Sequence, residues 1–548
     1  MNYHFSRHGL EGREKSLHRL FEILVGGTSW ALLLGMLFLS FWKPLEAAVL
    51  IIAFDLYWLL RLFYMTILLV LATLRLSLEK EADWMAQVRG IDDLSGTLAK
   101  MQRAGEGAPF KRKFTAWVHR KELEALEKSG SPPPASKEIY HLVLFPLLQE
   151  TREIVEPGVQ SLLSQWFPSK QILVVLAVEE RASAEVQRGA GEIREKYRDE
   201  LLDFLVLFHP DGLPGEARVK GANASFAARE AAKYFEARQI PFENVIVSCF
   251  DADTVVSPDY FSCLTYYFMV CPARNRASFQ PIPVYHNNIW EAPGFSRVLD
   301  IGSSFFQMIE ATNPDRLVTF SSHSMSFKAL VEVGCWPVDM ISDDSAIFWK
   351  AFIHYDGDYR VVPLPVTLSM DVVHAGTWWR TVVNVYRQKR RWAWGAENFP
   401  LVMRAFLKSD RIPLKVRMSH ALKLFDNHVS WATWGFLLTV IGWFPAVFSG
   451  HEFSNSVLYY SSPRITSTIF NLSFVAFFTT VLLSLSLLPK KKVKRPLLKR
   501  LGLAMEWLLV PFVFTFLSAL PALDAQTRLM FGRHMEFWAT EKKRNLDG

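Results

Sequence analysis

Cysteine is scarce in this sequence, which contains four cysteines among 548 residues. A small disulfide-stapled scaffold is therefore excluded, because such domains need a much higher density of cysteine pairs. The four lie in one stretch without C-x-x-C spacing, at Cys249, Cys263, Cys271 and Cys335. This pattern disfavours a zinc site and favours a reducing compartment.

Glycine and proline are also limited, at 28 residues each, which excludes collagen-like and proline-rich repeats. Charged residues make up 21% of the chain and hydrophobic residues 50%, so extensive disorder is excluded as well. The mean hydropathy of +0.12 is high for a soluble protein and low for a protein made only of membrane helices. A chain with several membrane spans and one large soluble domain accounts for both observations.

Long uncharged runs mark the predicted spans near the N-terminus. Residues 23–42 contain no charge, and about 20 apolar residues are needed to cross a bilayer core. A signal peptide would have a shorter apolar core and would not be followed at once by a second apolar stretch. Here residues 47–74 follow, with Asp55 and Arg61 as the charged exceptions. We therefore predict two transmembrane helices.

The membrane pattern returns in the C-terminal third of the chain. Residues 429–449 and 465–488 are predicted spans, and the apolar stretch 501–522 is interrupted by Pro511 and Pro521. Just before them, residues 413–428 are amphipathic and basic, which predicts a position in the membrane interface.

The segment between the two membrane regions has the pattern of a soluble α/β domain. Short apolar runs such as HLVLF and NVIVSCF alternate with helical stretches, which predicts a mostly parallel sheet flanked by helices and inserted between the transmembrane helices. The predicted N-terminal region with two transmembrane helices covers 1–77, and a charged helical segment with a proline-rich linker covers 78–137. The α/β domain covers 138–400 and is followed by amphipathic interface helices at 401–428. A C-terminal transmembrane region covers 429–522, and the tail covers 523–548.

The distribution of lysine and arginine predicts the orientation in the membrane. The first twenty residues hold four basic residues and 490–500 hold seven, whereas the loops at 43–46 and 451–464 hold one each. The N-terminus, the α/β domain and the 490–500 loop are therefore expected in the cytosol. Basic residues then crowd the inner face of the plasma membrane beside its lipids, so the net charge of +7 requires no nucleic-acid partner.

Five complete spans would leave the C-terminal tail outside, yet the tail is basic. Its lysines and arginines are Arg528, Arg533, Lys542, Lys543 and Arg544. A proline-broken re-entrant segment at 501–522 would keep the tail in the cytosol, since irregular backbone at membrane depth is tolerated where protein or water covers it.

Two Asp-x-Asp strings differ in their context. Asp251 and Asp253 directly follow the apolar run NVIVSCF, and ligands of open α/β sheets bind beyond the carboxyl ends of the strands. Two carboxylates at such an end suit a hard divalent cation that bridges substrate phosphates. Asp356 and Asp358 lie in HYDGDYRVV, where Asp-Gly before a β-rich run is an ordinary turn. We assign function to the first string and a structural role to the second.

Two further motifs carry chemistry. Asp343 and Asp344 open a helical stretch, where they either complement the helix dipole or place a general base in a cleft. The string 388–392, QKRRW, combines arginines that can hold a diphosphate bidentately with a tryptophan that offers a flat face to a sugar ring. An amphipathic helix lying on the membrane, with its tryptophan in the aromatic belt, is the alternative interpretation of this string.

The order of these motifs resembles the membrane-integrated family 2 glycosyltransferases, which include cellulose, chitin and hyaluronan synthases. The resemblance covers residues 138–400 and, by layout, the flanking spans. It extends to FWATEK in the tail, where Phe537, Thr540 and Lys542 match the F-x-V-T-x-K gating loop of the synthases with Ala539 in place of valine. That loop is cytosolic in the family.

The resemblance implies a GT-A fold and inverting transfer from a nucleotide sugar, with UDP as the carrier. It implies Mg²⁺ or Mn²⁺ bound by Asp253, and Asp344 as the general base. Asp343, which stands where the family usually has Glu, and Trp392 would contact the acceptor. The implied donor-binding residues are Asp251, Gln388, Arg391, and Lys220 and Asn223 of a segment resembling K-A-G-N.

Three segments depart from the family pattern. The first strand ends in FPLLQET, with Gln149 and Glu150, rather than near P-x-x-N-E. The second ends in Glu179 and Glu180 rather than paired aspartates, and either Glu can accept a hydrogen bond from a base or a ribose. The segment 321–324, SSHS, stands in place of a Cys-Gly-containing acceptor segment, and its His323 is either a site residue or a buried core histidine.

The leading interpretation is a metal-dependent hexosyltransferase that extends a growing polysaccharide and exports it. The second is transfer of one sugar to a lipid acceptor at the cytosolic face. A transporter is disfavoured by about 260 soluble residues beside four or five spans, and a catalytically inactive scaffold is distinguished by the absence of transfer from nucleotide sugars.

The basic tail generates a prediction about topology. A cysteine introduced at Asn545 should resist an impermeant thiol reagent in sealed, right-side-out vesicles, because the re-entrant segment keeps the tail inside. Labelling of that cysteine in intact vesicles would contradict both the re-entrant segment and the gating-loop assignment.

Overall fold

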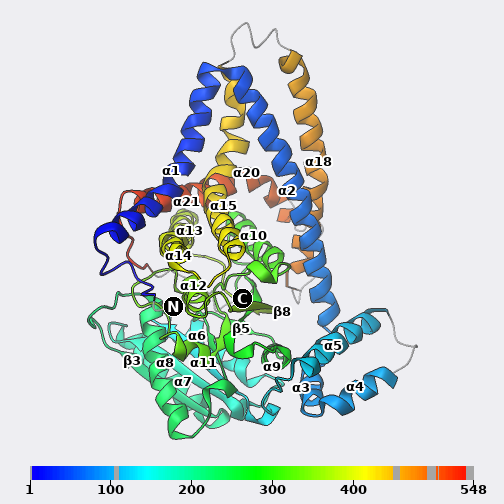
Figure 1. Cartoon of the computed structure of the whole chain (residues 1–548), viewed down its shortest axis with the longest axis vertical. Helices are drawn as coiled ribbons and strands as arrows, with labels where there is room; N and C mark the ends of the chain where they lie inside the picture. The colour runs from blue at the N-terminus through cyan, green and yellow to red at the C-terminus, as the bar shows by residue number, and fades with distance from the viewer. Residues whose placement is uncertain (1–2, 104–109, 449–456, 490–501, 504, 539–548) are drawn as a thin grey trace.

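The computed structural model describes residues 3–103, 110–448, 457–489, 502–503 and 505–538. Long helices stand side by side at one end of the molecule, and a sheet covered by helices forms the other end (Figure 1). The sheet end is built from the middle of the chain, and the helical end from the two flanking regions, as the sequence pattern predicts.

One sheet of eight strands forms the centre of the α/β domain in the described part of the chain, in the order β3-β2-β1-β4-β7-β6-β8-β5. The strands β3, β2, β1 and β4 run parallel to one another, and β6 runs parallel to β8. The strands β7 and β5 are antiparallel to the strands beside them. The strand bounds are Tyr140–Leu147 (β1), Ile172–Glu179 (β2), Asp203–His209 (β3), Val245–Cys249 (β4), Val255–Val256 (β5), Ala277–Val284 (β6), Ser324–Ser326 (β7) and Arg360–Ser369 (β8).

Helices cover both faces of this sheet, because β1, β2 and β4 are mostly apolar on both sides and mostly buried. One layer of the core joins β1 and β2 to the helices that follow them, and the other joins β1 and β4 to the alanine-rich face of α8. The helices of the domain are Arg152–Leu163 (α6), Ala184–Tyr197 (α7), Lys220–Ala237 (α8), Tyr260–Val270 (α9), Gly294–Glu310 (α10), Phe327–Glu332 (α11), Asp343–His354 (α12), Trp378–Ala393 (α13) and Asn398–Lys408 (α14).

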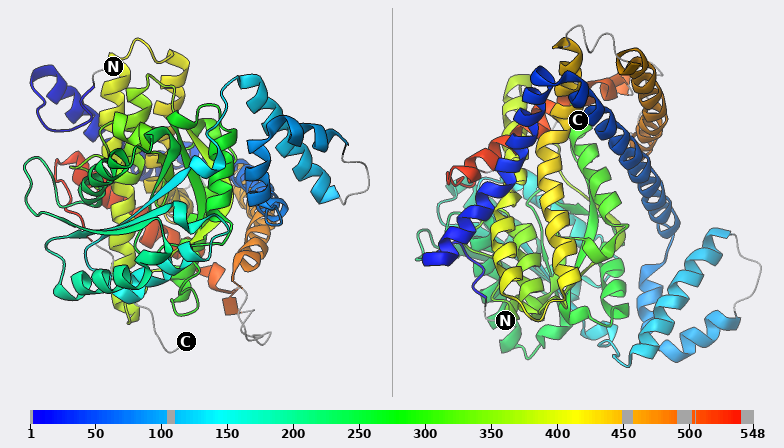
Figure 2. Two further views of the ribbon diagram at one scale, coloured as in Figure 1. Left: turned by 90° about the horizontal axis from the view of Figure 1, so that it is seen from below. Right: turned by 45° about the horizontal axis from the view of Figure 1, so that its top comes forward.

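The helical end contains the predicted spans. Among the described residues, four helices are long and apolar enough to cross a membrane, and a bent pair at 414–447 would make a fifth. The long helices are Gly12–Trp42 (α1), Pro44–Glu79 (α2), Leu414–Thr439 (α15) and Val457–Leu487 (α18). They run together away from the sheet, with α18 packed along α2 (Figures 1 and 2).

The segment 506–530 is long enough to span a membrane but lies in a different direction. It crosses the other long helices between the bundle and the α/β domain (Figure 1). Its helix is irregular, with a 3-10 turn (Glu506–Leu509), α20 (Val510–Phe514), a π turn (Thr515–Ala519) and α21 (Leu520–Met530). Proline breaks the regular hydrogen-bond ladder, and Pro511 and Pro521 stand at the first turns of α20 and α21.

The first helix holds α21 in this crosswise position. Gly26 lies so close to α21 that a Cβ there would be 2.8 Å from the carbonyl oxygen of Gln526. Ser29 donates to the Gln526 side chain at 2.7 Å, and the Trp30 indole donates to the Thr527 hydroxyl at 2.9 Å. At the end of α21, the Arg19 guanidinium donates to the carbonyls of residues 529 and 530. The last carbonyls of a helix need such partners.

Two other segments connect the halves. Residues 413–428, predicted as a separate interface segment, form the first part of α15, which continues without a break to Thr439. Beneath α2, a helical arm made of Trp84–Asp92 (α3), Leu94–Arg103 (α4) and Phe110–Ser129 (α5) projects from the side of the α/β domain (Figure 2). Trp84 joins this arm to α9 through contacts with the rings of Tyr266 and Tyr267.

Two adjacent glycines of α1 provide a test of this packing. Gly26→Ala should lower the free energy of unfolding by about 1–3 kcal/mol, because the added methyl group meets the backbone of α21. Gly27→Ala is the matched control, since its Cβ would be 3.8 Å from its nearest neighbour and should instead favour the helix by about 0.5–1 kcal/mol. Equal thermal midpoints for both purified variants would show that α21 is not packed on Gly26.

Candidate active site

An ion cluster at the carboxyl ends of the strands lies at the centre of the candidate site. The Lys220 ammonium, at the start of α8, donates to Asp251 Oδ1 at 2.7 Å. It also contacts both carboxylate oxygens of Asp344, at 3.1 and 3.4 Å. Asp251 follows β4, and Asp344 opens α12. The structure therefore brings together three predicted site residues that are far apart in the sequence.

The charges in this cluster are mutually dependent. Burial opposes the charged form of Lys220, yet the carboxylates of Asp251 and Asp344 outweigh it and raise the pKa of the ammonium well above its ordinary value. The lysine therefore remains a cation between two carboxylates. Without it, two negative groups would face each other in a partly buried cleft.

Close backbone packing places Lys220 at this point. The next residue, Gly221, lies where a Cβ would be 2.5 Å from the carbonyl oxygen of Pro337 and 3.0 Å from the Asp343 Cβ. A larger residue would push α8 away from the start of α12. Glycine at 221 therefore allows the lysine and the acidic pair to meet.

Asp343 has a different environment from its neighbour. Its side chain is 3% exposed, and among the described residues its Oδ2 atom has no hydrogen-bond partner. Burial, and next the charge of Asp344, raise the pKa of the Asp343 carboxyl above its ordinary range. Asp344 is more exposed and carries the contact to Lys220. The two acidic residues are thus chemically distinct.

The two Asp-x-Asp strings also lie in different surroundings. Asp253 is 1% exposed, and its Oδ2 accepts a hydrogen bond from the backbone N–H of Asp371, just after β8, at 2.7 Å. Asp356 has a left-handed backbone with φ of 52°, as in a turn, and the exposed Asp358 pairs with Arg276 at 2.7 Å. The first string is therefore buried at the site and the second is a surface turn.

The segment that departs from the family pattern contacts the first string directly. Ser321 donates to Asp251 Oδ2 at 2.5 Å, and the Ser322 hydroxyl accepts from the Asp251 backbone N–H at 3.1 Å. Ser322 has a φ of 59°, which is costly for a residue other than glycine. Its hydroxyl contacts offset this cost. His323 is completely buried beside Asp344, with 4.0 Å between Nδ1 and Oδ1, and burial lowers its pKa.

The motif 388–392 lies on α13, with its charges directed to different neighbours. The Lys389 ammonium contacts Asp300 of α10 at 3.1 Å, and Arg390 contacts Asp524 of α21 at 2.9 Å. Arg391 lies over the Phe537 ring at 5.2 Å, and Trp392 meets the edge of Phe320 at a centroid distance of 5.7 Å. Gln388 is buried on the same helix.

A buried carboxylate that the sequence interpretation missed ties this motif to the acidic pair. Glu397 Oε1 accepts hydrogen bonds from the backbone N–H groups of Ile341 and Ser342, at 3.1 and 2.9 Å, and from the Ser342 hydroxyl at 2.8 Å. Its other oxygen accepts from the Trp394 indole at 2.9 Å. Burial raises the pKa of this carboxyl. Glu397 thus holds the segment that leads into Asp343, and no spacing rule in the sequence indicates it.

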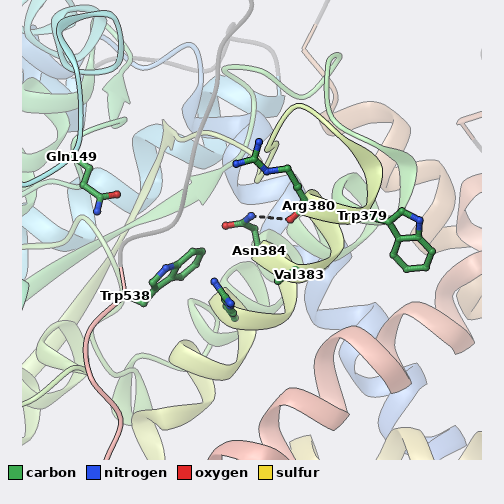
Figure 3. Close-up of a pocket in the computed structure, with 7 residues that line it drawn as sticks. Gln149, Trp379, Arg380, Val383, Asn384 and Trp538 are labelled. Carbon is green, nitrogen blue, oxygen red and sulfur yellow. Dashed lines mark hydrogen bonds between the residues drawn. The ribbon is translucent and has the colours of Figure 1, made fainter.

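An open cleft of about 500 Å³ lies along α13 beside the C-terminal tail. Trp538 stands between Gln149, beyond β1, and the helix face that carries Arg380 and Asn384 (Figure 3). The Arg387 guanidinium lies 5.2 Å from the Trp538 ring. The first residues of FWATEK therefore cover arginines of α13, whereas Thr540 and Lys542 of that motif lie outside the described residues.

The remaining predicted donor residues have local partners. The Asn223 amide donates to the backbone oxygen of Ala177 on β2 at 2.7 Å and is buried. Glu179 pairs with Arg181, and Glu180 accepts from the backbone N–H of Asp211 at 3.1 Å. Glu179 is the last residue of β2 and Glu180 follows it, at the same edge of the sheet as Asp251.

Comparison with known proteins defines the class. A family model described as "Glycosyl transferase family group 2" matches residues 246–518. A poly-beta-1,6-N-acetyl-D-glucosamine synthase of Staphylococcus aureus is 33% identical over 93 residues, which is 16% of this chain and 20% of that protein. The match thus spans about a fifth of the curated relative.

Similar solved structures are more distant in sequence. A mannosyltransferase from Pyrobaculum calidifontis, in complex with GDP-Man and Mn²⁺, has 12% identity and a TM-score of 0.41, covering 82% of this chain and 100% of that chain. TarS 1-349 of S. aureus in complex with UDP-GlcNAc has 13% identity and a TM-score of 0.35, covering 55% and 76%.

The mostly parallel sheet with acidic residues beyond its strand ends is the GT-A fold of a glycosyltransferase. The chain belongs to the family 2 glycosyltransferases. The predicted family and fold class are therefore confirmed.

Proposed function

We propose that this glycosyltransferase transfers a hexosyl unit from a UDP-sugar to a growing polysaccharide, with inversion, at the cytosolic face of the membrane, and that it couples synthesis to export. The observation that carries the proposal is the cluster of Lys220, Asp251 and Asp344, together with Arg391 of α13, whose charge acts on the neighbouring Asp343. It combines a carboxylate that can accept a proton with cations that suit a diphosphate.

Each residue has a role in this scheme. Asp344 accepts the proton of the acceptor hydroxyl, whose oxygen attacks the anomeric carbon as the bond to the diphosphate breaks. Gln388 and Arg391 bind the diphosphate, and Arg391 stabilises its developing charge. Lys220 and Asp251 orient the nucleotide half of the donor, with Asn223, Glu179 and Glu180 behind them. Trp392 and Asp343 contact the acceptor.

The residues present fit a divalent cation shared with the donor. Asp253 offers one buried carboxylate, and the described residues contain no group of three His, Cys, Asp or Glu side chains that would hold a metal alone. Mg²⁺ is typically bound by one or two carboxylates together with substrate phosphates and water. Mg²⁺ or Mn²⁺ held by Asp253 would neutralise charge on the leaving diphosphate.

Support for a polymeric product comes from two sources. The relative with 33% identity over 93 residues is a polysaccharide synthase. In addition, Phe537 and Trp538 cover Arg391 and Arg387 as a gating loop would. Transfer of one sugar to a lipid acceptor is the second candidate, favoured by the departure at 321–324 and by Ala539.

The test uses the full chain in lipid nanodiscs with a panel of UDP- and GDP-sugars and Mg²⁺ or Mn²⁺. We expect UDP release from one UDP-sugar and a ladder of products on sizing. A single lipid-sized product would favour the second candidate. Absence of both nucleotide release and transfer across the panel would overturn the proposal.

The two Asp-x-Asp strings give a matched pair of variants. Asp253→Ala should abolish metal-dependent transfer, because the diphosphate loses its bridge to the protein. Asp358→Ala should retain transfer and cost at most about 1 kcal/mol of stability, since it removes an exposed ion pair. Initial rates of UDP release from folded variants decide. Equal losses in both would contradict the assignment of function to the buried string.

The acidic pair on α12 gives a second matched test. Asp344→Asn should lower the transfer rate by about 10²–10⁴, the usual contribution of a general base, while nucleotide affinity persists. Asn caps a helix about as well as Asp, so a purely structural role predicts a near-normal rate. Asp343→Asn is the control and should be milder. If Asp343→Asn is the inactive variant, the base assignment is wrong.

A further inference from the structure

A buried ion pair joins α10 to α13 beside Trp392. The Lys389 ammonium contacts the Asp300 carboxylate at 3.1 Å and donates to the Ser303 hydroxyl at 3.0 Å. Lys389 is 2% exposed and Asp300 is 3% exposed. Position 389 is one of the two open positions of the Q-x-x-R-W motif, so the resemblance to the family assigns no role to this lysine.

The same ammonium lies over the indole of Trp392, with 3.9 Å between the Lys389 Nζ and the ring centroid. A cation is attracted to the face of an aromatic ring, and the attraction is stronger when both groups are removed from water. The indole also meets the rings of Tyr285 and Phe320, at centroid distances of 6.5 and 5.7 Å. Trp392 itself is only half-buried. Its neighbours therefore hold the ring while part of it stays accessible.

Helix α10 provides a fixed anchor for this cation. Arg297 Nε donates to Glu506 Oε2 of the crosswise segment at 3.0 Å. A Cβ at Gly302 would be 2.8 Å from the Phe514 ring, so α10 also packs closely on that segment. Asp300 lies between Arg297 and Gly302 on the same helix. The position of the carboxylate that holds the ammonium is therefore determined by packing on both sides.

Packing alone does not require charges at this point. Burial lowers the pKa of the Lys389 ammonium, whereas the Asp300 carboxylate favours its charged form. The cost of taking both charges out of water offsets much of their attraction, and apolar residues of similar volume often replace buried ion pairs without loss of stability. A cation here therefore indicates a role besides joining α10 to α13, and its contact with the indole supplies one.

We propose that Lys389 and Asp300 are positioning residues for Trp392, and that the ammonium fixes the plane in which the indole meets the acceptor sugar. The proposal rests on the proposed function, since it takes Trp392 as the residue that contacts the acceptor. Both residues act through the ring rather than on the substrate. Without the cation the indole is free to tilt, so acceptor binding weakens, whereas donor binding by Gln388 and Arg391 changes little.

The first experiment uses the full chain in lipid nanodiscs with the double variant Asp300→Asn/Lys389→Met. This change removes both charges at similar volume, so no unpaired buried charge remains to unfold the protein. The apparent KM for added cellotetraose or chitotetraose should rise about five- to tenfold, the size of one lost cation–π contact, and products made without added acceptor should be shorter. The apparent KM for the UDP-sugar should change by less than about twofold, because the cation does not contact the donor.

The neighbouring ion pair gives a matched control. Arg390→Met/Asp524→Asn removes charges that join the same helix to α21, and the Arg390 guanidinium lies over Tyr386 rather than over Trp392. The control should leave the acceptor KM and the product length near the wild type. Equal changes in both double variants would mean that Lys389 only anchors the helix, which overturns the proposal.

A third variant tests whether the cation acts through the ring. In a Trp392→Leu background, Asp300→Asn/Lys389→Met should raise the acceptor KM no further, because residues that act through one contact have non-additive effects. The same fold-increase in both backgrounds would contradict a positioning role, since an independent structural effect adds to the loss of the ring.

The second experiment needs no turnover. The full chain labelled with fluorotryptophan gives a fluorine NMR resonance of Trp392, which is identified by its absence from Trp392→Phe. This resonance should move and broaden in Asp300→Asn/Lys389→Met and stay unchanged in the Arg390 control. An unchanged resonance in the folded double variant would overturn the positioning role even if transfer continues. Absence of nucleotide release and transfer by the wild type would overturn the proposed function instead, and the resonance would still report whether Lys389 orders the ring.

Discussion

The contact of one ammonium with two carboxylates is the constraint on which the rest of this site depends. Asp251 and Asp344 come from different parts of the α/β domain and would repel each other in a partly buried cleft. Lys220 contacts both, at 2.7 and 3.1 Å, and thereby fixes the start of α8 against the end of β4 and the start of α12. Removing one partner of a buried ion pair typically costs about 3–5 kcal/mol, so this arrangement has little freedom to vary. Gly221 follows from the same constraint, since α8 must approach Pro337 closely.

The helix α13 shows how one motif serves both structure and chemistry. Lys389 and Arg390 anchor it to α10 and α21 through Asp300 and Asp524. This leaves Arg391 toward the tail and Trp392 toward Phe320. The alternative interpretation, a helix at the membrane interface, is also supported, because α13 is anchored to α21. That helix crosses the long helices where the bundle meets the α/β domain (Figure 1). Two charged residues of the string therefore hold the helix in place, and Arg391 contacts the tail.

The sequence predicted the fold class and family well, because both depend on local patterns. Alternation of apolar runs with helical stretches predicted the fold class. The order of the Asp-x-Asp string, the acidic pair, the QKRRW string and the membrane spans indicated the family. Contacts between distant segments were not predictable: Lys220 and Asp344 are 124 positions apart, and Glu397 has no motif of its own. Hydropathy also predicts the length of an apolar helix but not the direction in which it runs. The crosswise path of 506–530 is therefore visible only in the structure, where α21 packs against Gly26. The sequence analysis also did not predict that 413–428 continues into the rest of α15. An amphipathic interface helix and the start of a longer helix have the same residue pattern.

The helix α13 directs its arginines and its tryptophan to different neighbours. Arg387 and Arg391 are four residues apart and share one helix face, which borders the open cleft and the tail. Trp392 is five residues beyond Arg387, or about 140° farther around the helix, where it contacts the Phe320 ring. One helix thereby presents guanidinium groups beside the tail and an aromatic ring on another side.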